Sequence, residues 1–303
     1  MMENSGRPGR RTVSRRRVVG TAAAAVAAAG AGVVGYLATR SDRDRAEALT
    51  ARWHAGALPP DPGDPAWLRV APVEIPLLPQ KIVPPMLGEQ VIAHLRLRVL
   101  HNGGEIAFHL EWQDAKVDEL EAMGRFRDAV AVQLPVVTGT TPPAITMGGP
   151  GQPVHILHWK ASWQADLDTG QKGVKDAFPN AFNDVYPEAV LGEAGARDFY
   201  PALAVGNLMA RRDKTSSVEE LVAVGFGTLT THDQQRAKGR AAFADGRWRV
   251  VIALPMTGGK NQATIRPGSS THVAVAAWDG AHGNRGARKQ WSNWTSMHVE
   301  RTA

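Results

Sequence analysis

Two stretches of alternating apolar and polar residues, joined by a short glycine turn, constrain the fold of this chain most strongly. In residues 90–100 and again in residues 106–112, apolar side chains occupy every second position. The turn between them is Asn102-Gly103-Gly104. A period of two places alternate side chains on one face of a β-strand, and Asn-Gly pairs favour tight turns between antiparallel strands. The sequence therefore predicts a β-hairpin of half-buried strands.

Further short strands are predicted along the rest of the chain. They are expected in residues 126–135, 154–159, 248–255, 272–278 and 294–300, with an edge strand within residues 70–78. The pairs Asp245-Gly246 and Asp279-Gly280 are typical of turns. Many short strands with few helices favour a mainly all-β chain, an antiparallel β-sandwich.

Two regions are predicted to depart from this pattern. Ser217 followed three positions later by Glu220 matches a capping box, which predicts a short helix through Ala223 that ends at Gly225. Residues 166–212 show little periodicity, so they are expected to form a long loop excursion. Aromatic residues within it predict ordered packing, namely Phe178, Phe182, Tyr186, Phe199 and Tyr200.

The N-terminal segment has the features of an export signal. Ser14 precedes an arginine pair and apolar residues, as in twin-arginine signals, and an Ala/Gly-rich run follows in residues 20–38. The expected location is the periplasm or the outer face of the cytoplasmic membrane, with an uncleaved signal serving as an anchor as the alternative to cleavage. The expected division is residues 1–45 for the signal, 46–85 for a proline-rich linker and arm, and 86–303 for the β-sandwich domain.

Charge and cysteine content exclude several kinds of function. Residues 1–45 hold nine arginines against three acidic residues, so they carry the whole net charge of +6 and residues 46–303 are neutral. This balance argues against binding of nucleic acid, which requires excess positive charge. The chain has no cysteine. Disulfides, iron–sulfur ligation, thiolate zinc sites and covalent c-type haem are therefore excluded, and a redox centre must use His, Met, Lys, Tyr or carboxylate ligands.

Common catalytic motifs are missing from the sequence. It has no Gly-x-Ser-x-Gly elbow, phosphate loop, dinucleotide fingerprint or His-Glu-x-x-His pair. His155 and His158 stand three positions apart on a predicted strand and so face opposite sides, which makes them a poor chelating pair. No catalytic residue is predicted.

The loop around Met147 is the best candidate for a cofactor site. Glycine and proline residues follow Met147, and then a short apolar strand ends in Trp159 and Lys160, with Trp163 beyond it. A thioether presented from such a loop beside aromatic surface suits a flat iron-containing cofactor. The plain alternative is that Met147 fills a hydrophobic core.

Several segments, in order, resemble the haem b subunit of the ethylbenzene, dimethylsulfide, selenate and chlorate molybdoenzymes. These enzymes form the type II dimethylsulfoxide reductase group, and the resembling domain is called ethylbenzene dehydrogenase-like. The resemblance extends over roughly residues 70–300, through the segments 126–135, 147–149, 154–160, 206–207, 218–229, 245–251, 276–280 and 286–294.

The resemblance implies a β-sandwich that holds one non-covalent haem b between a methionine and a lysine. It places the methionine at Met147 and favours Lys289 for the lysine, with Lys260 as the alternative and Lys160 as a weaker third choice. Four tryptophans are expected to pack around the ring, although core packing would explain them equally well: Trp159, Trp163, Trp278 and Trp294.

The function implied by the resemblance is electron transfer without catalysis. An exported subunit of this kind relays single electrons between the iron–sulfur partner of a molybdopterin catalytic subunit and an external donor or acceptor, either a cytochrome or a quinone-linked protein. Two other classes remain open from the residues themselves. One is a haem-free secreted β-sandwich module that binds carbohydrate through its tryptophans, and the other is a secreted hydrolase that uses scattered Asp and His residues.

Overall fold

The predicted hairpin is present in the computed structural model as strands β4 (His94–His101) and β5 (Glu105–Gln113). The side chain of Asn102 accepts hydrogen bonds from the amides of Gly104 and Glu105, and Gly103 adopts a φ of 88°. Only glycine adopts such a φ without cost, which explains the turn. The structure describes residues 49–137, 139, 141–172, 174–180, 201–211 and 213–302.

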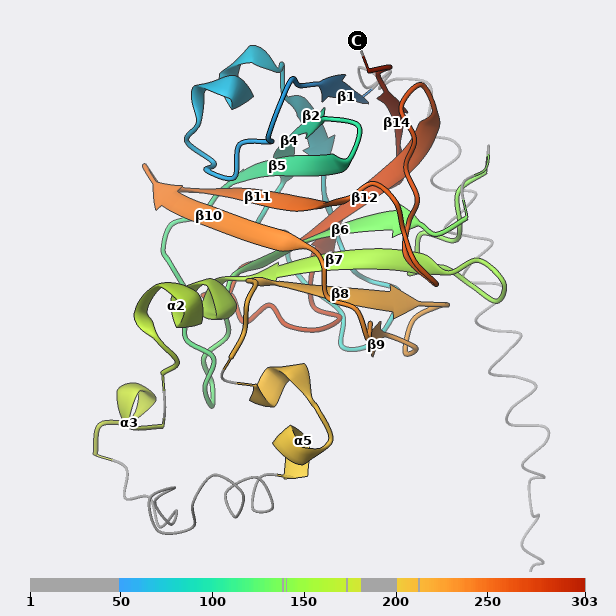
Figure 1. Ribbon diagram of the computed structural model, residues 1–303. Helices are drawn as coiled ribbons and strands as arrows, with labels where there is room; N and C mark the ends of the chain where they lie inside the picture. Colours follow the sequence, from blue (N-terminus) through green and yellow to red (C-terminus); the bar gives the residue numbers. More distant parts are fainter. Residues whose placement is uncertain are drawn as a thin grey trace, which may run out of the picture. The chain divides into compact units, whose positions relative to one another are not determined.

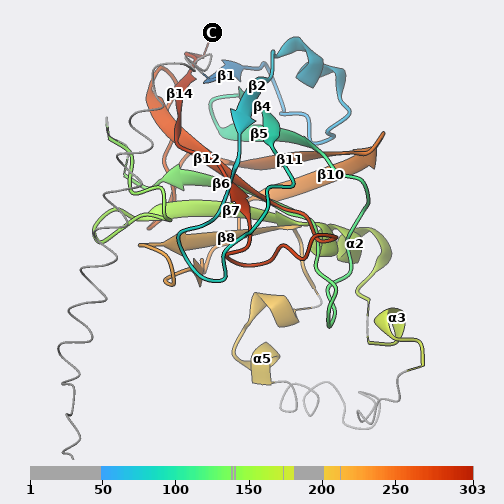
Figure 2. The same ribbon diagram turned by 180° about the vertical axis from the view of Figure 1, so that it is seen from behind.

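The strands form two layers that share strand β12 (Figure 1). Their order along the sheet is β10-β11-β5-β4-β1-β14-β12-β6-β7-β8-β9. The first part of β12 pairs with β14 in one layer and the rest pairs with β6 in the other, so β12 runs from layer to layer (Figure 2). The described strands not yet bounded are β1 (Leu49–Trp53), β2 (Val73–Pro76), β3 (Leu78–Pro79), β6 (Ala129–Pro135), β7 (Val154–Lys160), β8 (Val218–Ala223), β9 (Thr230–Thr231), β10 (Lys238–Ala244), β11 (Arg247–Pro255), β12 (Ser270–Trp278), β13 (Gln290–Trp291) and β14 (Thr295–Val299).

The main hydrophobic core lies between the two layers. Leu97 and Phe108 come from the hairpin, Val132 from β6 and Trp159 from β7, and all four are almost fully buried. The described pairings are antiparallel, apart from those of β1 with β4 and β14. The predicted fold class, a mainly β-sandwich, is confirmed.

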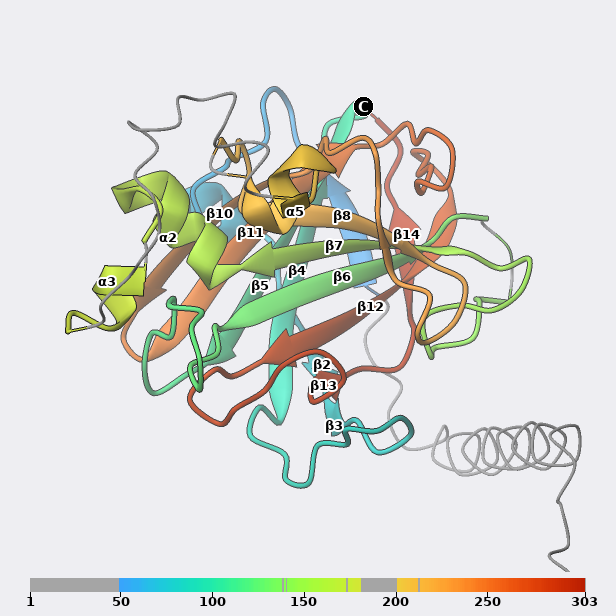
Figure 3. The same cartoon turned by 90° about the horizontal axis from the view of Figure 1, so that it is seen from below.

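The layer made of β12, β6, β7 and β8 is apolar on both faces. Its inward-facing residues belong to the main core, whereas Ala131, Ile156 and Trp278 belong to a second cluster on the outer face. Figure 3 shows this outer face with the four strands side by side. An apolar outer face is unusual for an antiparallel sheet in water, and it is where the candidate site lies.

The capping box at residues 217–220 does not start a helix, so that prediction is wrong. Residues 218–223 form β8 and pair along their length with β7. Glu220 is buried, and its carboxylate accepts hydrogen bonds from His155, Gln262 and two backbone amides. The periodicity of this short segment does not distinguish a helix from a strand. The hydrogen bonds that Glu220 makes with distant residues therefore outweigh the local preference for a helix.

Several elements were not anticipated. Strand β10 precedes the Asp245-Gly246 turn, where both residues have positive φ, as in the tight turns that join hairpin strands. Helix α2 (Ala161–Thr169) follows β7 directly and ends at Gly170. The other described helical turns are short, namely η1 (Pro65–Arg69), α3 (Val174–Ala177), α5 (Pro201–Ala204) and η2 (Leu208–Ala210).

The described residues, which lie within 49–302, belong to one compact unit. Strands β1 and β2 lie within the expected linker, residues 46–85, and pair with β4, so this segment is an integral part of the sheet. The export signal lies outside the described residues, and so do positions 173, 181–200 and 212 of the 166–212 excursion, which include Phe182, Tyr186, Phe199 and Tyr200. Among the described helices, none has the length and hydrophobicity needed to cross a membrane.

Candidate functional site

Met147 lies in the loop between β6 and β7 in a rare backbone conformation. Its φ is 69°, and that of Gly148 is 80°. The amide of Gly148 donates to the carbonyl of Ala144 at 2.8 Å, and the carbonyl of Met147 accepts from the amide of Gly225 at 2.8 Å. A Cβ atom on Gly148 would lie 2.5 Å from the carbonyl oxygen of Gln152. The loop is therefore tightly packed, and it holds Met147 against the turn that follows β8.

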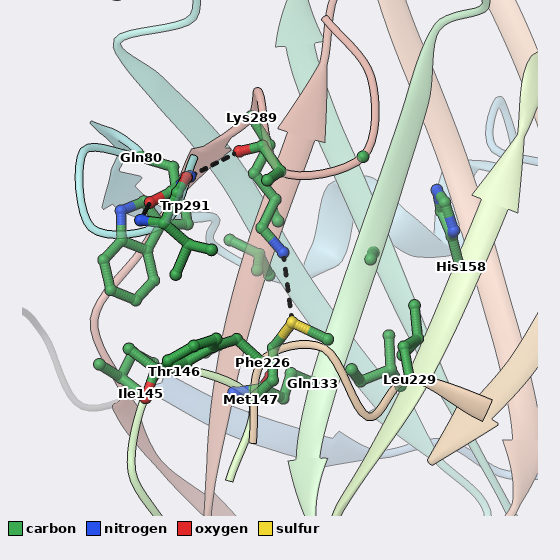
Figure 4. A pocket seen from close by; sticks show the side chains of 18 of the residues that line it. Gln80, Gln133, Ile145, Thr146, Met147, His158, Phe226, Leu229, Lys289 and Trp291 are labelled. Carbon is green, nitrogen blue, oxygen red and sulfur yellow. Dashed lines mark hydrogen bonds between the residues drawn. The ribbon is translucent and has the colours of Figure 1, made fainter. Parts of the chain in front are cut away.

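The side chain of Lys289 points toward Met147 from a loop near the C-terminal end of the chain. It precedes β13, and its carbonyl accepts from the amide of Gln80 at 2.9 Å. Its amine nitrogen Nζ lies 4.0 Å from the Sδ atom of Met147 and 5.3 Å from the centre of the Trp278 ring. Figure 4 shows the two side chains pointing toward each other from facing loops.

A cavity of about 310 Å³ surrounds this pair on the outer face of the sheet. The floor of the cavity is formed by small side chains on β6 and β12, namely Ala131, Ala274 and Ala276. Their small size leaves space above the sheet. Its other lining residues include Ile145, Phe226, Leu229, Trp278 and Trp291. Lys289 is the only charged side chain among the described lining residues. The cavity is a mostly apolar site with one amine and one thioether facing each other.

Burial lowers the pKa of Lys289 from 10.5 to about 8. The cause is desolvation, which disfavours the charged ammonium form. A lysine can bind a metal only through its neutral amine, whose lone pair becomes available when the proton leaves. The apolar surroundings therefore favour the form of Lys289 that can act as a ligand.

Met147 and Lys289 fit an iron-centred cofactor. Bonds from a first-row metal to nitrogen or sulfur are about 2.0–2.3 Å long, so two opposed ligand atoms stand roughly 4.3 Å apart. The observed separation of 4.0 Å is close to this value. The cavity around the pair is lined by apolar and aromatic side chains, as a flat hydrophobic macrocycle requires.

The two other candidate lysines do not line this cavity. Lys260 is exposed in the loop between β11 and β12, where its carbonyl accepts from His232. Lys160 is buried at the end of β7, where it pairs with Glu219 and lies 4.0 Å from the centre of the Trp163 ring. Geometry thus favours Lys289 over both alternatives.

The four predicted tryptophans separate into two pairs. Trp278 lines the cavity and donates to the carbonyl of Gly286, and Trp294 packs on the same outer cluster as Met147. In contrast, Trp159 lies in the main core against Trp248, and Trp163 is buried on α2. The expectation that Trp159 and Trp163 surround the cofactor is corrected.

Strand register explains this correction and identifies a residue that was missed. Adjacent residues on a strand face opposite sides, so Trp159 in the core places His158 on the cavity side. The ring of His158 stacks on Trp278 with their centres 4.8 Å apart. The sequence does not indicate which face of β7 turns toward the core, because β7 is apolar on both faces.

Two features of the described residues bear on the alternative functions. The nine tryptophans all fall among the described residues, and every one is buried or half-buried, so they form no exposed platform for sugars. Asp114, Asp128 and Asp279 do cluster within 4.8 Å, but they are buried and line none of the cavities described here.

This chain is similar to several known proteins. The chain is 26% identical over 238 residues to the putative respiratory nitrate reductase heme subunit ORF7 of Haloferax mediterranei, and the alignment covers 78% of this chain and 67% of that protein. Among solved structures, a family 9 carbohydrate-binding module from Caldicellulosiruptor kristjanssonii covers 84% of the chain at 8% identity, with a TM-score of 0.41 over 96% of that module. A putative carbohydrate-binding protein from Bacteroides uniformis covers 83% at 9% identity, with a TM-score of 0.43 over 90% of that protein.

The family comparison covers most of the domain. The model of the ethylbenzene dehydrogenase family matches residues 64–290, which include Met147, Trp278 and Lys289. The match extends over well more than half of the chain. The chain therefore belongs to the ethylbenzene dehydrogenase family, whose haem subunits its ordered sequence motifs resemble.

Proposed function

We propose that this protein is a haem b electron-transfer subunit of a molybdoenzyme complex, with Met147 and Lys289 as the axial ligands of one non-covalent haem. The observation that carries the proposal is the 4.0 Å approach of the half-buried amine of Lys289 to the thioether of Met147 at an apolar cavity. The family assignment and the haem-subunit relative support it.

When bound, the haem would supply a one-electron iron couple. Met147 contributes a soft thioether, which favours the reduced iron and raises the potential. Lys289 would contribute its amine, whose pKa burial lowers to about 8, so that loss of the proton on binding the iron costs less free energy. With both Met147 and Lys289 bound to the iron, no coordination site would remain for a substrate. The residues therefore suit electron relay, and catalysis is assigned to the partner.

The proposed setting is an exported complex. The twin-arginine signature supports export, and the natural partners are an iron–sulfur subunit and a molybdopterin catalytic subunit, with a cytochrome or a quinone-linked protein as the external acceptor or donor. The neutral charge of residues 46–303 is consistent with protein partners and not with nucleic acid.

The visible spectrum of the exported protein tests the proposal directly. The protein is purified from cells with ample haem, and its spectrum is recorded oxidised and then reduced with dithionite. Sharp reduced bands of a six-coordinate, low-spin b-type haem are expected. A colourless protein that also fails to take up added haemin would refute the proposal.

A further inference from the structure

A second cavity adjoins the first on the side of His158. Its volume is about 100 Å³, and His158, Trp278 and Gly286 line both cavities. This second cavity is more polar than the first, because the charged residues Arg127, Arg285 and Glu121 also line it. In the view of Figure 4, His158 lies across the Met147–Lys289 pair from Gln80 and Trp291. The apolar cavity thus continues, on the side of His158, into a charged recess.

The two arginines give this recess an unmatched positive charge. Arg127 forms an ion pair with Glu121, whose side chain is 45% exposed. Water screens such a pair strongly, so it satisfies Arg127 only in part. Arg285 is exposed; its guanidinium lies 4.3 Å from the centre of the Phe126 ring and donates to the carbonyl of Gly283. The lining therefore holds two cations against one exposed anion.

Two buried nitrogen atoms around the recess have no hydrogen-bond partner. They are Nε of Arg127 and Nε2 of His158. Buried polar atoms in folded proteins are almost always hydrogen-bonded, so a pair of such atoms beside one cavity points to a missing acceptor. The pKa of His158 is well below 6.5 because of burial and nearby cations, which leaves a neutral ring with one N–H to donate.

We propose that this recess binds the propionate carboxylates of the haem, with Arg127 and Arg285 as the cationic partners and His158 as a further hydrogen-bond donor. Guanidinium groups are well suited to carboxylates because their N–H donors match the two oxygens. The assignment fixes the orientation of the haem, whose carboxylate edge faces Arg127 and whose opposite edge faces Trp291. It rests on the proposed function, because it requires a haem between Met147 and Lys289.

The test compares haemin with haemin dimethyl ester, in which both carboxylates are neutral. Each is titrated into the apoprotein of the wild type, Arg127→Gln and Arg285→Gln, and the dissociation constants are measured from the absorption change. Arg125→Gln is the matched control, because Arg125 is exposed two positions from Arg127 and does not line the recess. Circular dichroism of each apoprotein checks the fold.

Each recess variant should weaken haemin binding by about tenfold or more and leave binding of the ester nearly unchanged. The wild type should itself bind the ester at least about tenfold more weakly than haemin, a comparison that needs no variant. Equal losses for haemin and ester, or no loss for haemin, would overturn this inference alone. Failure of the wild type to bind haemin at all would overturn the proposed function with it.

Discussion

The amine of Lys289 and the thioether of Met147 face each other across 4.0 Å although 142 positions separate them in the chain. Each is held by its own backbone contact, Met147 through the amide of Gly225 and Lys289 through the amide of Gln80. The separation is therefore set by the sheet and its loops and does not require the two side chains to attract each other. Such preorganisation is what a site for a rigid, flat group requires.

The first prediction concerns the ligands. Met147→Ala and Lys289→Ala should each convert the low-spin haem spectrum to a high-spin one, because each removes one axial donor. Lys260→Ala and Met123→Ala serve as controls, since Lys260 is exposed and Met123 is 89% exposed. Absorption spectra of the oxidised and reduced proteins give the result. A low-spin spectrum that survives in Lys289→Ala and is lost in Lys260→Ala would show that the lysine is misassigned.

The second prediction concerns the loop that presents Met147. Gly148→Ala should abolish the methionine-ligated spectrum and destabilise the protein by about 1–3 kcal/mol, because its Cβ meets a backbone oxygen at 2.5 Å. Gly151→Ala is the matched control. It has a similar positive φ of 73° but open space around its Cβ, so it should cost about 1 kcal/mol and keep the spectrum. Urea unfolding and absorption spectra distinguish the two, and identical behaviour would contradict the role of close packing.

The third prediction separates the two pairs of tryptophans. Trp159→Leu should lower the free energy of unfolding by about 3 kcal/mol, because it opens a cavity in the main core. The haem bands of this variant should keep their positions. Trp278→Leu should instead weaken haemin binding, since Trp278 lines the site. Urea unfolding of the apoproteins and haemin titration measure both effects, and a spectral shift in Trp159→Leu would count against the packing described here.

The fourth prediction concerns pH. Burial, with the nearby charges of Asp279 and Asp118, raises the pKa of Asp114 from 3.8 to about 6. The folded state then holds this proton more tightly than the unfolded state. Its stabilising effect is present below pH 3.8 and is lost as the pH rises through about 6. Asp114→Asn removes the buried charge, so it should stabilise the protein at pH 8 by up to about 3 kcal/mol and have little effect near pH 4.

Urea unfolding at the two pH values measures this difference for Asp114→Asn. Asp245→Asn is the control, because Asp245 is exposed at a hairpin turn and its positive φ of 55° suits asparagine as well as aspartate. A stability change that is the same at both pH values would show that the carboxyl of Asp114 has an ordinary pKa in the folded protein.

Local pattern was enough to predict much of the fold. The period of two in residues 90–112 predicted the hairpin, because alternation and a glycine turn are properties of the backbone itself. Strand β10 is not predicted, although an Asp-Gly pair such as Asp245-Gly246 often joins two antiparallel strands. Residues 217–223 were predicted as a helix because a capping box is a local signal, and the partners of Glu220 lie elsewhere in the chain.

The sequence by itself determined the mainly β class, the exclusion of every thiolate-based centre, and Met147 as the candidate ligand on its glycine-rich loop. Only the tertiary structure decided which lysine meets Met147 and which tryptophans lie near them. The physical reason is that an apolar strand shows that side chains alternate without showing which face turns inward. It is the pairing of β6, β7, β8 and β12 that places His158 and Trp278 beside the site and Trp159 in the core.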